Sequence, residues 1–130
     1  MAREIVHTIA EYYDGPVEGV ADFGGRPHVY RRQIDRETDE FTDDYWLMEI
    51  DRETLELAVE MNEIHNRWAV AFQRGEAKRD VPLPEDRQRA SELIAEIGDR
   101  LVLNRTRAIT VRGKMLPGTP LMVEWETSAR

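Results

Sequence analysis

The sequence predicts a single α+β domain over residues 1–130, with a mainly antiparallel sheet and two amphipathic helices packed on it. Three observations lead to this fold class. Four alternating or strongly apolar runs, separated by turn signals, fill the first part of the chain up to Ile50. Two stretches in the middle have apolar residues at three- and four-residue spacing. Two further alternating runs follow, so the predicted order is β-β-β-β-α-α-β-β.

The first three predicted strands form a meander. Residues 4–13, 17–23 and 27–34 alternate or are rich in β-branched side chains, which favours extended backbone. Asp14-Gly15-Pro16 separates the first two strands, and Gly24-Gly25 is a two-residue hairpin signal between the second and third. Tight connections of this kind make neighbouring strands antiparallel.

Residues 35–44 carry six carboxylates and only one arginine. Like charges at this density resist packing, so the segment is predicted to be a solvated, mobile loop. The alternative is an acidic docking surface for a basic partner, or a cation site. Calcium is disfavoured because its binding loop needs a glycine, which this segment lacks. The next residues, 45–50, are apolar on both sides, which is typical of a central or covered strand.

Residues 51–75 are predicted to form one long helix around which the chain is organised. Asp51 can accept hydrogen bonds from the free amides of the first turn, Glu53 suits the positive end of the helix dipole, and Gly75 is a natural stop. One face gathers the apolar side chains and a histidine, and it is expected to pack on the sheet. These residues are Leu57, Ala58, Met61, Ile64, His65, Trp68 and Phe72.

The second predicted helix begins at Pro84 and has one apolar stripe, which favours pairing with the first helix or packing beside it on the sheet. The stripe consists of Ala90, Leu93, Ile94, Ile97 and Leu101. The final strands, 107–115 and 121–125, form a hairpin that is able to pair with an edge of the first meander. The last strand is also considered as an exposed edge through which a homodimer would form, and residues 127–130 are expected to be frayed.

The formal charge of −8 disfavours nucleic acid as a partner and suits a basic protein instead. No apolar run approaches the ~20 residues needed to span a bilayer, so no membrane partner is expected. The N-terminal residues carry acids early and have no long apolar core, which argues against a signal peptide and favours a cytoplasmic location. The chain has no cysteine, which excludes disulfides, thiolate metal sites and cysteine nucleophiles.

Known catalytic and cofactor patterns are missing from the sequence. Neither serine, Ser91 or Ser128, lies in a strand-turn-helix elbow, and no glycine-rich loop precedes a helix to hold phosphate. His65 has no second metal-ligating residue three or four positions away along the helix. No metal and no cofactor are therefore expected, and the balance favours a protein that is not an enzyme.

His65 keeps a functional question open. It lies on the apolar face of the first helix, where it is either a neutral histidine at the rim of the core or an acid/base group in a pocket between helix and sheet. The weak catalytic candidates are His65, His28, Asp14 and Asp22. The weak binding candidates that would line such a pocket are Tyr12, Tyr13, Tyr30, Trp46 and Trp68.

Three N-terminal motifs, YDGP at 13–16, GVAD at 19–22 and GRPH at 25–28, precede the tryptophan-containing helix. With Arg67-Trp68 and the later LPEDR at 83–87, the chain resembles an uncharacterised family of small bacterial proteins that share this hairpin and helix. The resemblance implies a bacterial origin and the hairpin-then-helix layout. It implies no activity and no catalytic residue.

Three function hypotheses follow. The leading one is a non-enzymatic protein-interaction module of immunity or regulatory type, because no nucleophile, metal motif or cofactor loop is present and the surface is acidic. The alternative is a small-molecule-binding domain or enzyme, with a pocket between the 51–75 helix and the sheet around His65. The third is a homodimer of structural role, so that the chain is either a monomer or a homodimer.

Overall fold

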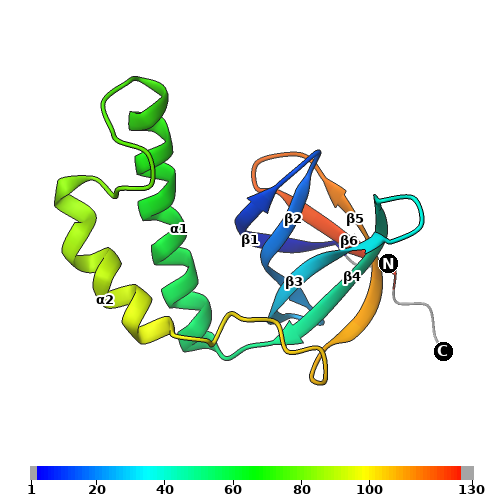
Figure 1. Ribbon diagram of the computed structural model, residues 1–130. Helices are drawn as coiled ribbons and strands as arrows, with labels where there is room; N and C mark the ends of the chain where they lie inside the picture. Colours follow the sequence, from blue (N-terminus) through cyan, green and yellow to red (C-terminus); the bar gives the residue numbers. More distant parts are fainter. Residues whose placement is uncertain (1–2, 127–130) are drawn as a thin grey trace.

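The computed structural model describes residues 3–126 and shows a closed antiparallel barrel of six strands, from which a pair of helices projects (Figure 1). The strands are β1 (Arg3–Tyr12), β2 (Pro16–Phe23), β3 (Arg26–Asp35), β4 (Glu40–Glu49), β5 (Ile109–Leu116) and β6 (Met122–Trp125). Between β4 and β5 lie α1 (Arg52–Gln73), a short 3-10 turn η1 (Pro84–Asp86) and α2 (Arg87–Ile97). The predicted order of elements is therefore found, but the predicted α+β sheet with two packed helices is wrong.

The barrel closes because the last strand returns to the first. Each strand pairs antiparallel with its neighbour in the chain, and β6 pairs with β1 through contacts such as Ile5 opposite Met122. A closed barrel leaves no free strand edge. The predicted pairing of the final hairpin with the first meander is thus correct, whereas the predicted exposed edge at 121–125 is wrong, since β6 is paired on both sides and Trp125 is fully buried.

The barrel interior is filled by aromatic and branched side chains. Tyr30, Tyr45 and Trp125 meet edge to face, with ring centroids 6.1 Å apart for the tyrosine pair and 5.4 Å for Tyr45 and Trp125. Trp125 fits because Gly113 lies against its ring, where any Cβ would overlap the indole. The interior is therefore a packed core and leaves room for a ligand only at the ends of the barrel.

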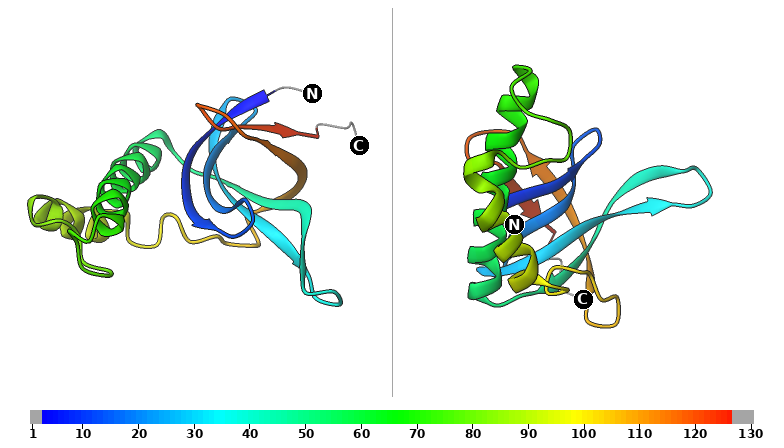
Figure 2. Two further views of the ribbon diagram at one scale, coloured as in Figure 1. Left: turned by 90° about the horizontal axis from the view of Figure 1, so that it is seen from above. Right: turned by 60° about the vertical axis from the view of Figure 1, so that its left-hand side comes forward.

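The acidic segment is mostly strand, which corrects the predicted mobile loop at 35–44. Asp35 pairs with Glu40 and Ile34 with Phe41, so only residues 36–39 form the turn. Antiparallel pairing with β3 outweighs the poor strand propensity of these carboxylates. The tip of this β3–β4 hairpin extends beyond the barrel (Figure 2).

The long helix has nearly its predicted bounds. The Asp51 carboxylate accepts from the Thr54 amide at 2.8 Å, and Gly75 takes a positive φ of 73° just beyond the last turn. Its packing differs from the prediction, because, of the predicted stripe, Ala58 packs on the barrel, together with Leu55 and Val59. They cover an apolar patch on the outer barrel wall made by Val20, Val29, Met48 and Ile50.

Other residues of the apolar stripe predicted to lie on the sheet pack on the second helix instead. Leu57 and Ile64 of α1 form a separate core with Ala90, Leu93 and Ile97 of α2. In Figure 1, α1 accordingly stands between α2 and the barrel. Helix α2 ends at Gly98, which places Leu101 in the connection back to β5 rather than in the helix. The predicted fraying at 127–130 lies outside the described residues.

Candidate functional site

Two ion pairs, each made by two hydrogen bonds, join α1 to the segment that begins α2. We call residues 52–97 the helical hairpin. Arg67 donates from Nε and Nη2 to the two carboxylate oxygens of Asp86, at 3.0 and 2.9 Å. Arg89 does the same to Glu60, at 2.6 and 2.8 Å. Each fork matches the planar geometry of guanidinium and carboxylate. The arginines hold the pKa of Asp86 and that of Glu60 below their usual range.

An apolar groove of about 240 Å³ lies between α1, α2 and the connection that joins them, and we call it the hairpin groove. Its apolar lining far exceeds its polar lining, and the polar groups are His65 and Asp80. The full lining is Met61, Ile64, His65, Trp68, Asp80, Val81, Pro82, Ala90 and Ile94.

The groove continues into a stack of aromatic rings along α1. The Trp68 and Phe72 rings are nearly parallel with centroids 5.0 Å apart, and the His65 ring lies 5.5 Å from that of Trp68. Trp68 Nε1 donates to the Lys78 carbonyl at 2.8 Å, which fastens the interhelical connection over this end of the groove. The site is therefore built by rigid helices and a tethered loop.

Large apolar side chains around the groove remain open to solvent. Ile94 is 65% exposed, and Phe72, which stacks on Trp68, is 37% exposed. Apolar surface that gathers at one end of a structure in this way is characteristic of an interaction site.

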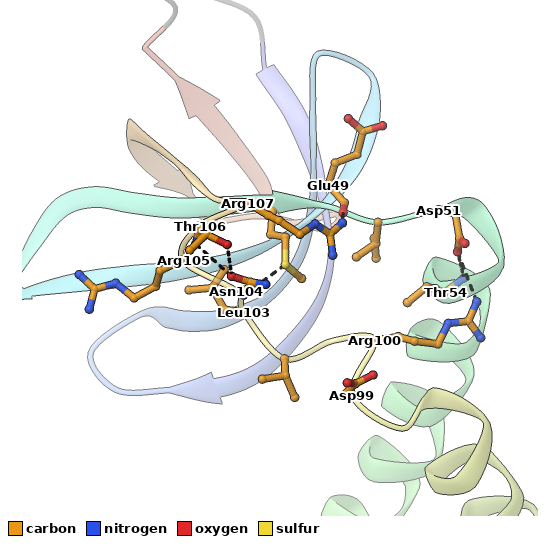
Figure 3. A pocket seen from close by; sticks show the side chains of 13 residues that line it. Glu49, Asp51, Thr54, Asp99, Arg100, Leu103, Asn104, Arg105, Thr106 and Arg107 are labelled. Carbon is orange, nitrogen blue, oxygen red and sulfur yellow. Dashed lines mark hydrogen bonds and ion pairs between the residues drawn. The ribbon is translucent and has the colours of Figure 1, made fainter.

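The hollow at the junction of hairpin and barrel, about 750 Å³ in volume, is lined by apolar and polar side chains, and several of the polar ones already bind neighbouring residues (Figure 3). Arg100 reaches Asp51 at 3.5 Å, Arg107 donates to the Glu49 carbonyl at 3.4 Å, and Asn104 accepts from Thr106. These contacts fix the two chain crossings between barrel and helices, so we interpret the hollow as a structural joint.

Comparisons with family models, with curated proteins and with solved structures gave no match. The resemblance to a family of small bacterial proteins therefore stays a prediction. Among the described residues, no helix is long and apolar enough to cross a membrane. Within residues 3–126, no group of three or more histidine and carboxylate side chains is arranged to hold a metal ion.

The four catalytic candidates do not form one site. His65 is exposed at the rim of the hairpin groove, which lies between the two helices and not between a helix and the sheet. His28 is buried, with Nδ1 2.8 Å from the Arg26 carbonyl oxygen. Asp22 instead binds His7, at 2.8 Å, and Asp14 lies at one end of the barrel.

The binding candidates are equally dispersed. Only Trp68 joins His65 in the groove. Tyr12 and Tyr13 are exposed near the β1–β2 turn, whereas Tyr30 is wholly buried in the barrel and donates to the Thr8 carbonyl. Trp46 lies half-buried on the outer wall, with the Arg105 guanidinium 4.4 Å from its ring centroid.

Sequence reasoning missed the half of the groove that comes from the interhelical connection and α2. Ile94 was assigned to a buried stripe, because periodicity places it beside Leu93 and Ile97 without showing which positions a partner covers. One signal for this half of the groove is present in the sequence. Val81 and Pro82 are apolar residues in an otherwise polar connection.

Proposed function

We propose that this protein is a protein-interaction module that binds its partner in the hairpin groove. The observation that carries the proposal is the exposed apolar surface formed by Ile94, Phe72 and the lining of the groove, held on a hairpin that projects from the barrel. Antiparallel helices with an apolar groove between them receive an amphipathic helix from a partner in a recurring mode of recognition.

The size of the groove favours side chains of a partner over a separate small molecule. Its volume of about 240 Å³ lies below the ~300–1,000 Å³ of typical small-molecule sites. A groove of this size accommodates one or two large apolar side chains. The alternative of a small ligand beside His65 would use the same groove, and we regard it as the weaker proposal.

The charge of the protein supports a partner segment that carries basic residues beside its apolar stripe. Asp80 belongs to the lining of the groove, and the chain as a whole has a formal charge of −8. Opposite charge on the partner would speed association and orient it in the groove. The partner we expect is thus an amphipathic helix with leucine- or phenylalanine-like anchors and a lysine or arginine opposite Asp80.

The test compares Ile94→Glu with Val102→Glu as bait in a lysate of the organism that encodes the protein. These two side chains are 65% and 64% exposed, so both substitutions place a charge on already solvated surface, but only Ile94 lines the hairpin groove. A partner captured by the wild type and by Val102→Glu, and lost with Ile94→Glu, is the expected result. Capture that survives Ile94→Glu would place binding elsewhere and overturn the proposal.

The partner segment is then identified by crosslinking and made as a peptide. Replacing its basic residue by alanine is expected to weaken binding to the wild type more than binding to an Asp80→Asn variant, as a double-mutant cycle requires. Equal losses with both proteins would remove the charged contact from the proposal. Sedimentation of the protein alone separates partner binding from self-association through the same apolar surface.

A further inference from the structure

A second hollow, of about 360 Å³, opens at one end of the barrel, and we call it the barrel mouth. It lies between the β1–β2 turn, the β5–β6 turn and the paired strands β3 and β4. Its volume is within the range of small-molecule sites, which occur preferentially in places such as the mouths of β-barrels. The lining includes Tyr12, Asp14, Arg32, Asp43, Tyr45, Lys114, Met115, Pro117 and Leu121.

The lining of the barrel mouth includes Tyr45, a tyrosine whose ring is buried in the barrel core and whose hydroxyl has no hydrogen-bond partner among the described residues. Tyr45 is 2% exposed, and none of the hydrogen bonds among residues 3–126 involves its hydroxyl. Tyr30, its neighbour in the core, differs in donating to the Thr8 carbonyl at 3.1 Å. No buried side-chain nitrogen or oxygen of the described residues lacks a partner, so the Tyr45 hydroxyl is open to the cavity, where it can donate to a ligand. Burial raises the pKa of Tyr45, which keeps this hydroxyl a proton donor.

Arg32 presents a positive charge in the same cavity. Its Nε donates to the Thr42 carbonyl at 2.6 Å, its Nη2 is 3.4 Å from an Asp43 oxygen, and its guanidinium lies 5.6 Å from the ring centroid of Phe41. These contacts fix the side chain, which is only 21% exposed. No partner within the described part of the chain binds Nη1, which faces Gly15 at the β1–β2 turn.

The other side chains that line the barrel mouth determine which apolar and charged groups a ligand there can carry. Met115, Pro117 and Leu121 supply an apolar wall beside the two polar groups, and Lys114 adds a second cation with no ion pair among the described residues. Asp14 and Asp43 lie in the same lining. They oppose a ligand with several negative charges and are compatible with an amino group.

We propose that the barrel mouth binds a small monocarboxylate with an apolar body. The carboxylate accepts from the Tyr45 hydroxyl and from Arg32 Nη1, and the apolar body rests on Met115, Pro117 and Leu121. Free organic acids and α-amino acids share this chemistry, and the amino group of the latter would face Asp14 or Asp43. This site is separate from the hairpin groove, so its occupancy does not depend on the protein partner.

The test is an NMR titration of the ¹⁵N-labelled full chain with phenylpropionate, L-phenylalanine and phenylethylamine. Saturable shifts at the Gly15, Gly113 and Lys114 amides with both carboxylates, and none with the amine that lacks one, are the expected result. Tighter binding of L-phenylalanine than of phenylpropionate would assign the site to amino acids, and the reverse order to free acids. Shifts with the amine alone, or no saturable shift with any probe at millimolar concentration, would overturn the proposal.

Two variants locate the binding, with a third as the control. Tyr45→Phe keeps the ring packing and removes only the hydroxyl, so the dissociation constant is expected to rise about tenfold. Arg32→Gln should weaken binding further. The control is Arg31→Gln, because the Arg31 side chain pairs with Glu18 and does not line the barrel mouth. Binding unchanged in Tyr45→Phe, with its fold confirmed by circular dichroism, would contradict the assignment even if Arg32→Gln fails to fold.

Discussion

Arg67 on α1 and Asp86 at the start of α2 are joined by two parallel hydrogen bonds, which makes this pair the fastening at the solvent end of the helical hairpin. Asp86 is 8% exposed, whereas the side chain of Arg67 is half exposed. The carboxylate is therefore held at the edge of the hairpin core, and the hairpin depends on its charge.

Replacing Asp86 by asparagine is expected to loosen α2 without unfolding the barrel. Asparagine has nearly the same shape but removes the charge and one of the two acceptor oxygens. Amide hydrogen exchange should become faster in α2 and in the 74–83 connection, and stay unchanged in β1–β4. Glu92→Gln is the matched control, because Glu92 binds Arg89 on the exposed surface of one helix. Equal effects of both variants would contradict the role given to Asp86.

Acid is expected to release the hairpin before the barrel. The pKa values of Asp86 and Glu60 are lowered in the folded protein by Arg67 and Arg89, and that of Asp51 by its hydrogen bonds to Thr54. A carboxyl group with a lowered pKa contributes stability that is complete above its unfolded value of ~4 and is lost as the pH falls through the folded value. Helical circular dichroism should therefore decrease below about pH 4 while the near-ultraviolet signal of the barrel aromatics persists. Simultaneous loss of both signals would contradict this order.

Alkali is expected to act on the barrel instead. Burial raises the pKa of Tyr30, whose hydroxyl donates to Thr8 inside the barrel, and burial also raises that of Tyr45. For a raised pKa, the contribution is complete below the unfolded value of ~10 and is lost as the pH rises toward the folded one. Tyrosinate absorbance from Tyr30 and Tyr45 should appear in a cooperative step that coincides with unfolding. Ionisation of Tyr30 and Tyr45 while the barrel stays folded would refute the burial argument.

Gly113→Ala is expected to destabilise the barrel by about 1–3 kcal/mol, because the new Cβ would overlap the Trp125 ring. In a Trp125→Phe background the same change should cost less, since the six-membered ring of the indole is gone. Lys114→Ala, at the next and exposed position, is the control and should change stability little. Denaturant unfolding followed by tyrosine fluorescence compares the wild type, the two single variants, the double variant and the control. An additive double mutant would argue against the contact.

Leu93→Ala is expected to cost about 2–5 kcal/mol, because it empties the centre of the hairpin core. The adjacent Ile94→Ala should change stability by only about 0.5 kcal/mol, since Ile94 is 65% exposed. Thermal unfolding followed by far-ultraviolet circular dichroism compares the two. A cost for Ile94→Ala near that of Leu93→Ala would mean that the hairpin groove is closed in solution.

The helix bounds were predictable because their signals are local. Asp51 and Gly75 act through hydrogen bonds and backbone angles within a few residues, and both were found where the sequence placed them. The pairing of the final hairpin with an edge of the first meander was predicted, but closure was not, because it also requires β5 to pair with β4 at the other edge. Periodicity identifies a strand but not its neighbour, so an open sheet and a closed barrel look alike in sequence.

The candidate site was predictable only in part, for a related reason. The apolar stripe of α1 was correctly located, but most of it is covered by α2, and the barrel contacts its edge at Ala58 together with Leu55 and Val59. His65 therefore lies at a rim open to solvent. No signal for Tyr45 and Arg32 of the barrel mouth is present in the sequence. Their interest depends on the Tyr45 hydroxyl and Arg32 Nη1, which have no hydrogen-bond partner among residues 3–126, and only the folded structure shows this.

The helices leave and rejoin the barrel between two strands that are already neighbours, since Leu47 of β4 pairs with Ile109 of β5. In topological terms the helical hairpin is an insertion between β4 and β5. If a short β-turn joined these two strands instead, the chain would be an up-and-down barrel. Removal of the hairpin would expose Val20, Val29 and Met48, so the outer barrel wall needs the cover that α1 provides. The face of the hairpin turned away from this patch is free of that constraint, so its side chains can be replaced without changing the strands, their register or their closure.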